Sequence, residues 1–275
     1  MHWQETIKYD VKHALAEDIG DGDISAQLID ASRQLHTRLV VREDATLCGV
    51  AWVEETFRQC DESIAIEWFA DDGDFVTADT VVCNISGPAR PLLSAERTAL
   101  NFLQTLSATA TITKHYADLI RHTRCRVLDT RKTIPHLRLA QKYAVKCGGG
   151  LNHRIGLFDA FLVKENHLAA CGSIATAVER ARKLKPGVLL EVEVESLEEY
   201  RQAIDAQVDR VLLDNFSIEE TRQAVEINHG SVQLEASGNI TDQSLIAIAE
   251  TGVDFISIGA ITKHIRAIDF SLRYI

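Results

Sequence analysis

A regular alternation of short β-branched segments with stretches of helical periodicity is the feature that most constrains the fold of this chain. It begins near Arg126 and continues to about Ala260. Such alternation is typical of a parallel sheet with covering helices, and six expected strands favour a closed or partly open β/α barrel over a doubly wound sheet. We expect the strands near residues 125–128, 160–163, 188–194, 210–213, 232–235 and 254–258, with helices between them such as 173–184 and 218–228.

The first part of the chain has a different pattern. A helix is expected from Glu5 to Glu17, followed by a break rich in Gly and Asp, and residues 36–85 are expected to be rich in β-strand. Ser94 has a side chain suited to a helix N-cap, and the leucines that follow it at helical spacing predict a helix that links the two parts.

Two short motifs in this part suggest functions that the residues do not support. The segment 72–76 is similar to the hairpin of a lipoyl or biotinyl carrier, but no lysine occupies the hairpin tip. Asp18, Asp21 and Asp23 suggest calcium binding, but the twelve-residue loop pattern and its closing Glu are absent. We interpret these carboxylates as turn or capping groups.

Charge is distributed unevenly along the chain. The formal net charge is −11, which argues against a nucleic-acid surface. Residues 126–164 nevertheless contain eight Lys or Arg and two Asp, a local charge of +6. A cationic segment within an acidic protein suits a small anionic substrate better than a polymer. For Arg138, Lys142 and Lys146, spaced four residues apart, a solvated helix face is an open alternative.

Cysteine usage and the first residues bear on the compartment. Six cysteines occur without a C-x-x-C pair, so we expect buried reduced thiols rather than zinc ligands or disulfides. The first residues lack the basic and apolar regions of a secretory signal, and the longest uncharged stretch contains too many polar residues for a membrane span. We therefore expect a cytoplasmic protein.

Polar side chains follow every expected strand of the second part, where the catalytic groups of a β/α barrel lie. Arg131, Arg154 and Lys164 suit the binding of carboxylates or phosphates. Glu193 and Asp214 suit Mg²⁺ or the hydroxyls of a sugar. Small residues after the last two strands allow backbone N–H groups to approach a phosphate; they are Ser237, Gly238, Asn239 and Gly259.

Each of these residues also has a purely structural interpretation. Glu193 belongs to the alternating segment 191–195, whose three carboxylates share one face; an exposed strand explains them, whereas a barrel interior requires neighbouring cations. Asp214 can begin a turn, and Gly259 can serve only the start of a helix. The triple glycine 148–150 is expected to end a helix that starts near Leu137. His153 is either a donor to the ligand or a structural histidine.

Several motifs resemble those of the quinolinate phosphoribosyltransferases, also called nicotinate-nucleotide pyrophosphorylases (carboxylating). The likeness covers nearly the whole chain and is carried mainly by Leu128-Asp129-Thr130-Arg131-Lys132-Thr133, Asn152-His153-Arg154-Ile155-Gly156-Leu157, Leu162-Val163-Lys164-Glu165-Asn166-His167, Glu191-Val192-Glu193-Val194 and Leu213-Asp214-Asn215-Phe216. The resemblance implies a type II phosphoribosyltransferase fold, with an N-terminal α/β sandwich over 1–110 and an incomplete β/α barrel over 111–265. The tail 266–275 is expected to return to the sandwich.

The reaction that the resemblance implies joins quinolinate to phosphoribosyl pyrophosphate with Mg²⁺. It gives nicotinate mononucleotide, pyrophosphate and CO₂ in NAD biosynthesis, in a homodimer with shared sites. The catalytic residues implied are Lys132, Lys164, Glu193 and Asp214, of which Glu193 and Asp214 face the ribose and the metal. Arg131, His153, Arg154 and Lys164 are expected to hold the quinolinate carboxylates together with Arg97 of the neighbouring subunit. Thr130 and Lys132 line the same site, and residues 237–239 and 258–260 are expected to take the 5′-phosphate.

The sequence departs from the family pattern at two positions. His136 and Ala108 stand where glycine is common, and His136 lies in the segment that follows the Thr-Arg-Lys-Thr motif. Three alternatives stay open: a related pyrophosphorylase of the kind encoded beside molybdate transport genes, a nicotinate phosphoribosyltransferase, and a non-catalytic barrel that binds phosphosugars. The number of cationic residues favours a dicarboxylate substrate, and the Glu193 and Asp214 pair argues against simple phosphate binding.

Overall fold

The computed structural model describes residues 3–275, which form two compact units. The first unit contains residues 3–114, 133–149 and 261–275, and the second contains residues 115–132 and 150–260. These limits differ from the expected division at 110/111, because residues 133–149 and 261–265 pack with the first unit. Helix α3 (Ala89–Leu119) begins in the first unit and ends in the second.

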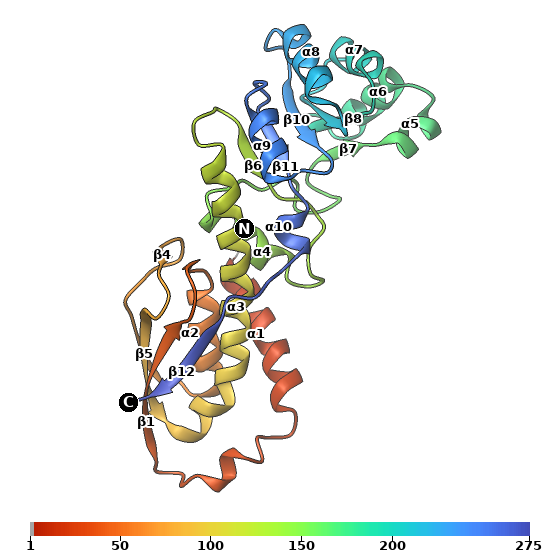
Figure 1. The fold of residues 1–275 in the computed structure, drawn as a ribbon. Helices are drawn as coiled ribbons and strands as arrows, with labels where there is room; N and C mark the ends of the chain where they lie inside the picture. Colours follow the sequence, from red (N-terminus) through yellow and green to blue (C-terminus); the bar gives the residue numbers. More distant parts are fainter. Residues whose placement is uncertain (1–2) are drawn as a thin grey trace. The chain divides into compact units, whose positions relative to one another are not determined.

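A four-stranded antiparallel sheet forms the base of the first unit, with strand order β12-β1-β5-β3. The strand β12 lies beside β1 although the two are far apart in the sequence, so the C-terminal tail completes this sheet (Figure 1). A small two-stranded sheet pairs β2 with β4. The strands are β1 (Gln34–Val41), β2 (Ala45–Thr46), β3 (Ala65–Trp68), β4 (Phe75–Val76), β5 (Val81–Pro88) and β12 (Phe270–Tyr274).

Helices cover this sheet and create two apolar clusters. One cluster joins the sheet to α2 and α3 through buried residues that include Leu39, Phe57 and Leu103. The other joins α1, α2, α3 and α4, with Trp52 and Leu106 at its centre. The unit is therefore an α/β sandwich, as expected. Its further helices are α1 (Trp3–Ile19), the 3₁₀ turn η1 (Ala26–Leu28), α2 (Val50–Cys60) and α4 (Arg138–Cys147).

Two sequence-based expectations for this unit are wrong. Residues 50–60 lie within the segment expected to be β-rich but form α2, where Trp52, Val53, Thr56 and Phe57 are buried at helical spacing. Ser94 does not cap α3, which begins at Ala89 and tolerates Pro91 in its first turn. The Ser94 hydroxyl is within hydrogen-bonding distance of Asp23 Oδ2 at 2.8 Å and of the Arg90 carbonyl oxygen at 3.1 Å.

The second unit is built on a six-stranded parallel sheet with strand order β6-β11-β10-β9-β8-β7. This is the order of a β/α barrel in which the first strand, β6, meets the last, β11, and the pairing of β6 with β7 is missing. The barrel is therefore open between β6 and β7. All six expected strands are confirmed: β6 (Arg126–Leu128), β7 (Phe161–Val163), β8 (Leu190–Val194), β9 (Arg210–Asp214), β10 (Gln233–Ser237) and β11 (Phe255–Ser257).

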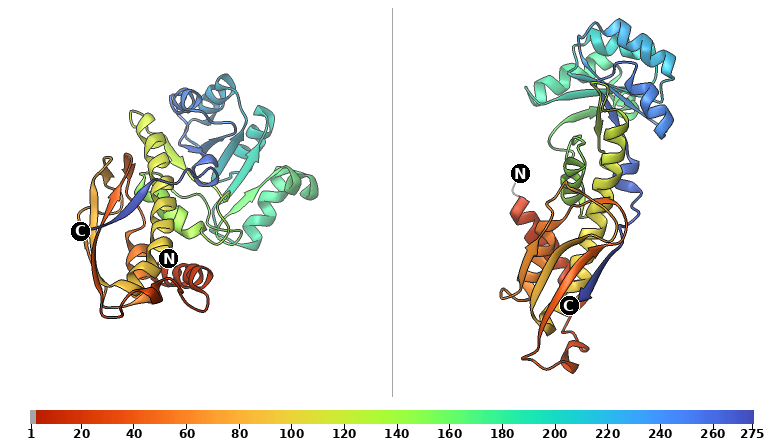
Figure 2. Two further views of the ribbon diagram at one scale, coloured as in Figure 1. Left: turned by 60° about the horizontal axis from the view of Figure 1, so that its bottom comes forward. Right: turned by 60° about the vertical axis from the view of Figure 1, so that its left-hand side comes forward.

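Helices follow β7, β8, β9 and β10 and lie outside the strands of this unit (Figure 2). Four of them begin at a Ser or Thr whose side chain accepts a hydrogen bond from a backbone N–H of the first turn. Among residues 3–275, no helix combines the length and apolar character needed to cross a membrane. The helices are α5 (Glu165–Cys171), α6 (Ile174–Leu184), α7 (Leu197–Asp205), α8 (Ile218–Asn228) and α9 (Asp242–Ala249), and the short α10 (Ala260–Lys263) follows β11.

The link between β6 and β7 explains why the barrel is open. Its only helix, α4, packs in the first unit, so the second unit has no helix to carry β7 back beside β6. The expected end of α4 at the triple glycine is confirmed, with Gly148 as its C-cap. This glycine is required by close packing: a Cβ atom at Gly148 would lie 2.4 Å from the Ala110 carbonyl oxygen and 2.6 Å from Thr113 Cβ.

We expect Gly148→Ala to lower the free energy of unfolding by about 1–3 kcal/mol, because the added methyl group forces α4 away from α3. Chemical denaturation followed by circular dichroism measures the change. Lys146→Ala is the matched control, since Lys146 is exposed in the last turn of the same helix and should change stability by less than about 0.5 kcal/mol. Equal stability of Gly148→Ala and the wild type would contradict this account of the packing.

Candidate active site

A cavity of about 570 Å³ opens at the carboxyl ends of the parallel strands. Every residue that lines it belongs to the second unit. Nine residues predicted from the sequence are among them: Thr130, Arg131, Lys132, His153, Arg154, Lys164, Glu193, Asp214 and Ser237. The remaining lining residues were not predicted as site residues; they are Leu157, Leu162 and His167, which belong to the family motifs, and Leu212, Glu235 and Ser257.

Strand alternation directs charged side chains to the inner face of the sheet. In β8, Glu191 is fully buried and Glu193 lines the cavity, while Glu195 is exposed beyond the strand end. Glu191 is in register with Arg210 of β9, and Glu193 with Leu212. The interpretation that the alternating carboxylates face the barrel interior is therefore correct for Glu191 and Glu193.

The cationic side of the cavity comes from the segments next to the opening of the barrel. Arg131 and Lys132 follow β6, Arg154 precedes β7, and Lys164 follows it. The Nε atom of Arg131 is buried and has no hydrogen-bond acceptor among the described residues. Burial lowers the pKa of the Arg154 guanidinium, and repulsion from Arg131 lowers it further. Two neighbouring guanidinium groups, one of which has a buried unsatisfied donor, favour an anionic ligand with more than one acceptor.

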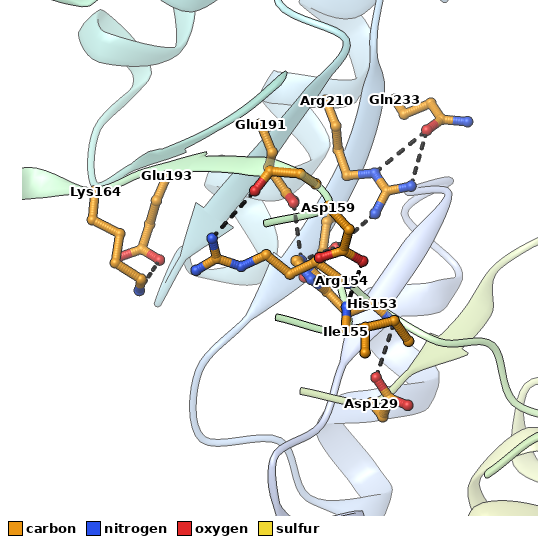
Figure 3. Close-up of polar contacts among 12 residues, drawn as sticks. Asp129, His153, Arg154, Ile155, Asp159, Lys164, Glu191, Glu193, Arg210 and Gln233 are labelled. Carbon is orange, nitrogen blue, oxygen red and sulfur yellow. Dashed lines mark hydrogen bonds and ion pairs between the residues drawn. The ribbon is translucent and has the colours of Figure 1, made fainter. Parts of the chain in front are cut away.

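Carboxylates occupy the other side of the cavity. Glu193 Oε2 lies 2.5 Å from Lys164 Nζ, and Figure 3 shows the two side chains directed at each other. Asp214, at the end of β9, accepts a hydrogen bond of 2.8 Å from the Asn215 side chain. The interior strands β8 and β9 thus contribute the acidic groups, and the sheet edges contribute the cations. The cavity has chemically different halves.

Hydrogen bonds to two carboxylates fix the segment that carries Arg154. The carboxylate of Asp129, directly after β6, accepts hydrogen bonds from the Asn152 side chain at 2.6 Å and from the His153 backbone N–H at 2.9 Å. Asp159 accepts from the backbone N–H groups of Ile155 at 2.7 Å and Gly156 at 3.0 Å. Arg154 therefore lies between two carboxylates that anchor its flanking backbone.

His153 has both ring nitrogens engaged within the protein. Its Nδ1 accepts a hydrogen bond of 2.7 Å from the Arg154 backbone N–H, and its Nε2 lies 2.9 Å from Glu191 Oε2 and 3.6 Å from Glu235 Oε2. The side chain is only 8% exposed. The structural interpretation of His153 therefore agrees better with the geometry than direct donation to a ligand.

A buried charged cluster lies beneath the cavity, formed by His153, Glu191, Glu235 and Arg210. Arg210 Nη1 lies 3.3 Å from Glu235 Oε2, and the guanidinium carbon stacks 4.3 Å from the Phe255 ring centroid. Burial raises the pKa of Glu191 to about 7 and that of Glu235 to about 8, and repulsion between the two carboxylates contributes to the shift of Glu235. Alternation in β9 and β10, where residues 210, 212 and 214 face residues 233, 235 and 237, is the signal that could have identified Arg210 and Glu235.

Most of the residues expected to bind a phosphate lie outside the lining of the cavity. Ile258, Gly259, Ala260, Gly238 and Asn239 do not line the cavity, in contrast to Ser237. The Ile258 N–H donates to the Leu128 carbonyl oxygen at 3.0 Å, so this donor is already used. Gly259 still affects the cavity, since a Cβ atom there would approach Lys132 Cδ to 2.8 Å.

Gly238 and Asn239 form a turn against Asn215. Both have left-handed backbone conformations, with φ of 103° and 44°. A Cβ atom at Gly238 would lie 2.1 Å from Asn215 Oδ1, so only glycine fits. This turn supports the loop that contains Asp214 and Asn215.

Two further sequence hypotheses concern basic residues of the first unit. Arg97 is exposed on α3 and is not among the residues that line the cavity. Arg138, Lys142 and Lys146 do not form a single solvated face, because Lys142 is fully buried and Arg138 is partly buried. His136, where glycine is common in the family, has a φ of 65° and therefore adopts a backbone conformation that favours glycine.

The raised pKa values of Glu191 and Glu235 make stability depend on pH. The folded protein keeps their protons at pH values where the unfolded chain, with a Glu pKa of 4.5, has lost them. This contribution is complete below the unfolded pKa and is lost as the pH rises through the folded values of about 7 and 8.

Glu235→Gln, which cannot ionise, should therefore lose less stability than the wild type between about pH 5.5 and pH 8.5. The difference is expected to be about 1.4 kcal/mol for each unit of pKa shift that is removed. Urea denaturation across this pH range measures it, with the exposed residue changed in Glu219→Gln as the control. If the free energy of unfolding depends on pH in the same way in Glu235→Gln and the wild type, the carboxyl group of Glu235 ionises in the folded protein as it does in the unfolded chain.

Sequence comparisons match both parts of the chain to one family. Residues 23–107 match the N-terminal domain of quinolinate phosphoribosyl transferase, and residues 109–273 match its C-terminal domain. A probable nicotinate-nucleotide pyrophosphorylase (carboxylating) from Synechocystis is 41% identical over 95% of this chain and 90% of the relative. The corresponding protein from Bacillus subtilis is 38% identical over 97% of this chain and 92% of the relative.

Solved structures show the same relationship. The nicotinate-nucleotide pyrophosphorylase from Francisella tularensis superposes with a TM-score of 0.94 at 51% identity, covering 98% of this chain and 96% of that one. NadC from Streptococcus pyogenes gives a TM-score of 0.95 at 39% identity, covering 100% of this chain and 98% of that one. The chain is a member of the quinolinate phosphoribosyltransferase family.

Proposed function

We propose that this protein transfers the phosphoribosyl group of phosphoribosyl pyrophosphate to quinolinate, with loss of CO₂, to form nicotinate mononucleotide in NAD biosynthesis. The supporting observation is the pair of neighbouring guanidinium groups, Arg131 and Arg154, at a cavity that also contains Glu193 and Asp214. A dicarboxylate needs the cationic surface, and a phosphosugar with its metal ion needs the carboxylates. The names of the relatives support the same reaction.

The cationic side of the cavity suits quinolinate. Arg131 and Arg154 can each bind a carboxylate through two parallel hydrogen bonds. Lys164 is close enough to share its three hydrogens between Glu193 and a substrate carboxylate. Thr130 and Lys132 line the same side, and Lys132 is suited to the pyrophosphate of the second substrate.

Glu193 and Asp214 suit the ribose and a magnesium ion that the pyrophosphate brings. Among the described residues, neither belongs to a group of three side chains close enough to hold a metal. Two carboxylates without a full protein cage fit Mg²⁺, which usually keeps waters and binds substrate phosphates. When bound, the ion neutralises charge on the leaving pyrophosphate. Ser237 lies next to Asp214 in register and suits the ribose phosphate end.

The protein's own residues can stabilise each stage of the reaction. As the bond between the ribose and pyrophosphate breaks, Glu193 and Asp214 stabilise the positive charge that develops on the sugar. The quinolinate nitrogen then bonds to the ribose and becomes cationic. Loss of CO₂ leaves an electron pair on the ring carbon, which the cationic nitrogen stabilises until a proton is added. No nucleophilic side chain is needed.

The alternatives differ in the charge of their substrate. Nicotinate has one carboxylate, and it would leave part of the Arg131, Arg154 and Lys164 group without a counterion. A human nicotinic acid phosphoribosyltransferase structure shares the fold, with a TM-score of 0.62, but only 13% identity. A phosphosugar sensor would not require Glu193 and Asp214 together. A related pyrophosphorylase of the kind encoded beside molybdate transport genes is the remaining alternative, and failure to release CO₂ from quinolinate would favour it.

We also propose that the protein works as a homodimer in the cytoplasm. Arg97 is exposed and belongs to the first unit, whereas all the residues that line the cavity belong to the second. A partner subunit that supplies Arg97 would add a third guanidinium group to the site. The six cysteines are all free, as expected in a reducing compartment.

The purified protein should release CO₂ from quinolinate labelled in the carboxylate next to the ring nitrogen. Release should require both phosphoribosyl pyrophosphate and Mg²⁺, because neither half of the cavity suffices for transfer. Collection of labelled CO₂ together with chromatography of the nucleotide product measures the reaction. Consumption of nicotinate in place of quinolinate, or no turnover of either compound, would refute the proposed function.

Arg97→Ala and Lys164→Ala should each be inactive as homodimers, but a mixture should recover activity if the sites are shared. Random exchange makes half of the dimers mixed, with one intact site each, so recovery should approach about a quarter of the wild-type rate. The rate is measured after subunit exchange has been verified with differently tagged chains. Absence of recovery in verified mixed dimers would argue that Arg97 acts within its own subunit.

A further inference from the structure

The cluster beneath the cavity contains three charged residues to which the proposed reaction gives no role. Glu191 and Glu235 are fully buried, and three of their four carboxylate oxygens have no hydrogen-bond donor among the described residues. Arg210 is held from three sides, by Glu235, by the Phe255 ring and by the Gln233 side chain, whose Oε1 is 3.1 Å from Nη2 (Figure 3). Burying such groups is costly, so the cluster requires an explanation.

A metal centre does not explain the cluster. His153, Glu191 and Glu235 each place a potential ligand atom within 4.8 Å of the others. However, the Arg154 N–H donates to His153 Nδ1, so the neutral ring carries its hydrogen on Nε2, the atom that faces both carboxylates. A protonated nitrogen has no lone pair for a metal. The Nε2 atom therefore offers no lone pair to an ion, and it faces Glu191 Oε2 at 2.9 Å.

The contacts form a chain from β9 to the substrate side of the cavity. Arg210 holds Glu235, and Glu235 and Glu191 hold the His153 ring from one side. On the other side, the ring accepts the Arg154 N–H. His153 and Arg154 both line the cavity, but the His153 side chain is only 8% exposed.

We propose that Arg210, Glu235 and Glu191 are positioning residues that fix the His153 ring, and that His153 in turn orients Arg154 without itself contacting the substrate. This inference rests on the proposed function, because it assigns to Arg154 the binding of a quinolinate carboxylate. It also separates His153 from the residues that hold the substrate. The cluster acts on affinity for quinolinate and leaves the carboxylate side of the cavity unchanged.

Steady-state kinetics of Glu235→Gln, His153→Gln and the double variant test the proposal. Each single variant should raise the KM for quinolinate about tenfold, the change typical of one charge-assisted hydrogen bond. The kcat and the KM for phosphoribosyl pyrophosphate should change less than about threefold, since Glu193 and Asp214 are untouched. The double variant should be no worse than the worse single variant, because both changes break the same chain of contacts.

The outcomes distinguish positioning from direct contact. If His153 binds the substrate itself, its loss and the loss of Glu235 will be additive, or Glu235→Gln will leave the KM unchanged; either result overturns the proposal. Glu198→Gln, at an exposed position of α7, is the matched control. Should Glu235→Gln not fold, Arg210→Lys tests the same contact, and an unchanged KM for quinolinate in that variant would also overturn the proposal.

A measurement without turnover separates this proposal from the proposed function. Nitrogen-15 correlation spectra of the histidine rings, with His153 assigned by its absence in His153→Gln, should show a neutral ring with hydrogen on Nε2. Glu235→Gln should shift this signal, and Glu198→Gln should not. Hydrogen on Nδ1, or a metal retained in stoichiometric amount by the wild type and lost in His153→Gln, would overturn the positioning role even if quinolinate is turned over.

Discussion

Carboxylates on the inner face of the parallel sheet impose the constraint on which the rest of the site depends. Glu191 and Glu235 are fully buried, and a buried carboxylate requires either a cation or a proton. The structure supplies both: Arg210 contacts Glu235, and burial raises the pKa of each carboxyl group toward neutrality. The interior next to the cavity is therefore a charged layer and not a purely apolar barrel core.

The missing pairing of β6 with β7 determines where the cations lie. A closed barrel would bring these two strands into one ladder, and the segments after them would be restricted to short loops. Here the link between β6 and β7 contributes α4 to the first unit and returns through residues 150–160. Arg131 lies near the start of this link and Arg154 near its end. The two ends are joined by a hydrogen bond that the Asp129 carboxylate accepts from the His153 backbone N–H. The opening of the barrel thus becomes the cationic side of the cavity.

The parallel sheet could be predicted from the sequence because each strand is a short β-branched segment with polar residues at its end. Features that depend on tertiary contacts could not be predicted from the sequence. The helix α2 was not predicted, because its residue types also favour β-strands. The helix α3 begins before Ser94, because Pro91 is compatible with the first turn of a helix. Arg210 and Glu235 look like exposed residues of ordinary strands until the register of β9 and β10 shows that they share the inner face. The phosphate expected at Gly238 and Asn239 stays a prediction, and the fold adds that both residues pack against Asn215.

His153 illustrates why a motif identifies a residue without defining its task. In the sequence it stands beside Arg154, and both side chains offer donors to an anion. In the fold, the backbone between them turns so that the Arg154 N–H points at His153 Nδ1, and the other ring nitrogen faces Glu191. Both ring nitrogens then contact the protein, and the side chain is only 8% exposed although it lines the cavity together with Arg154 and Arg131. Adjacent residues of one motif therefore make different contacts, because the hydrogen bond from the Arg154 N–H fixes the His153 ring toward the buried carboxylates and does not hold the Arg154 side chain.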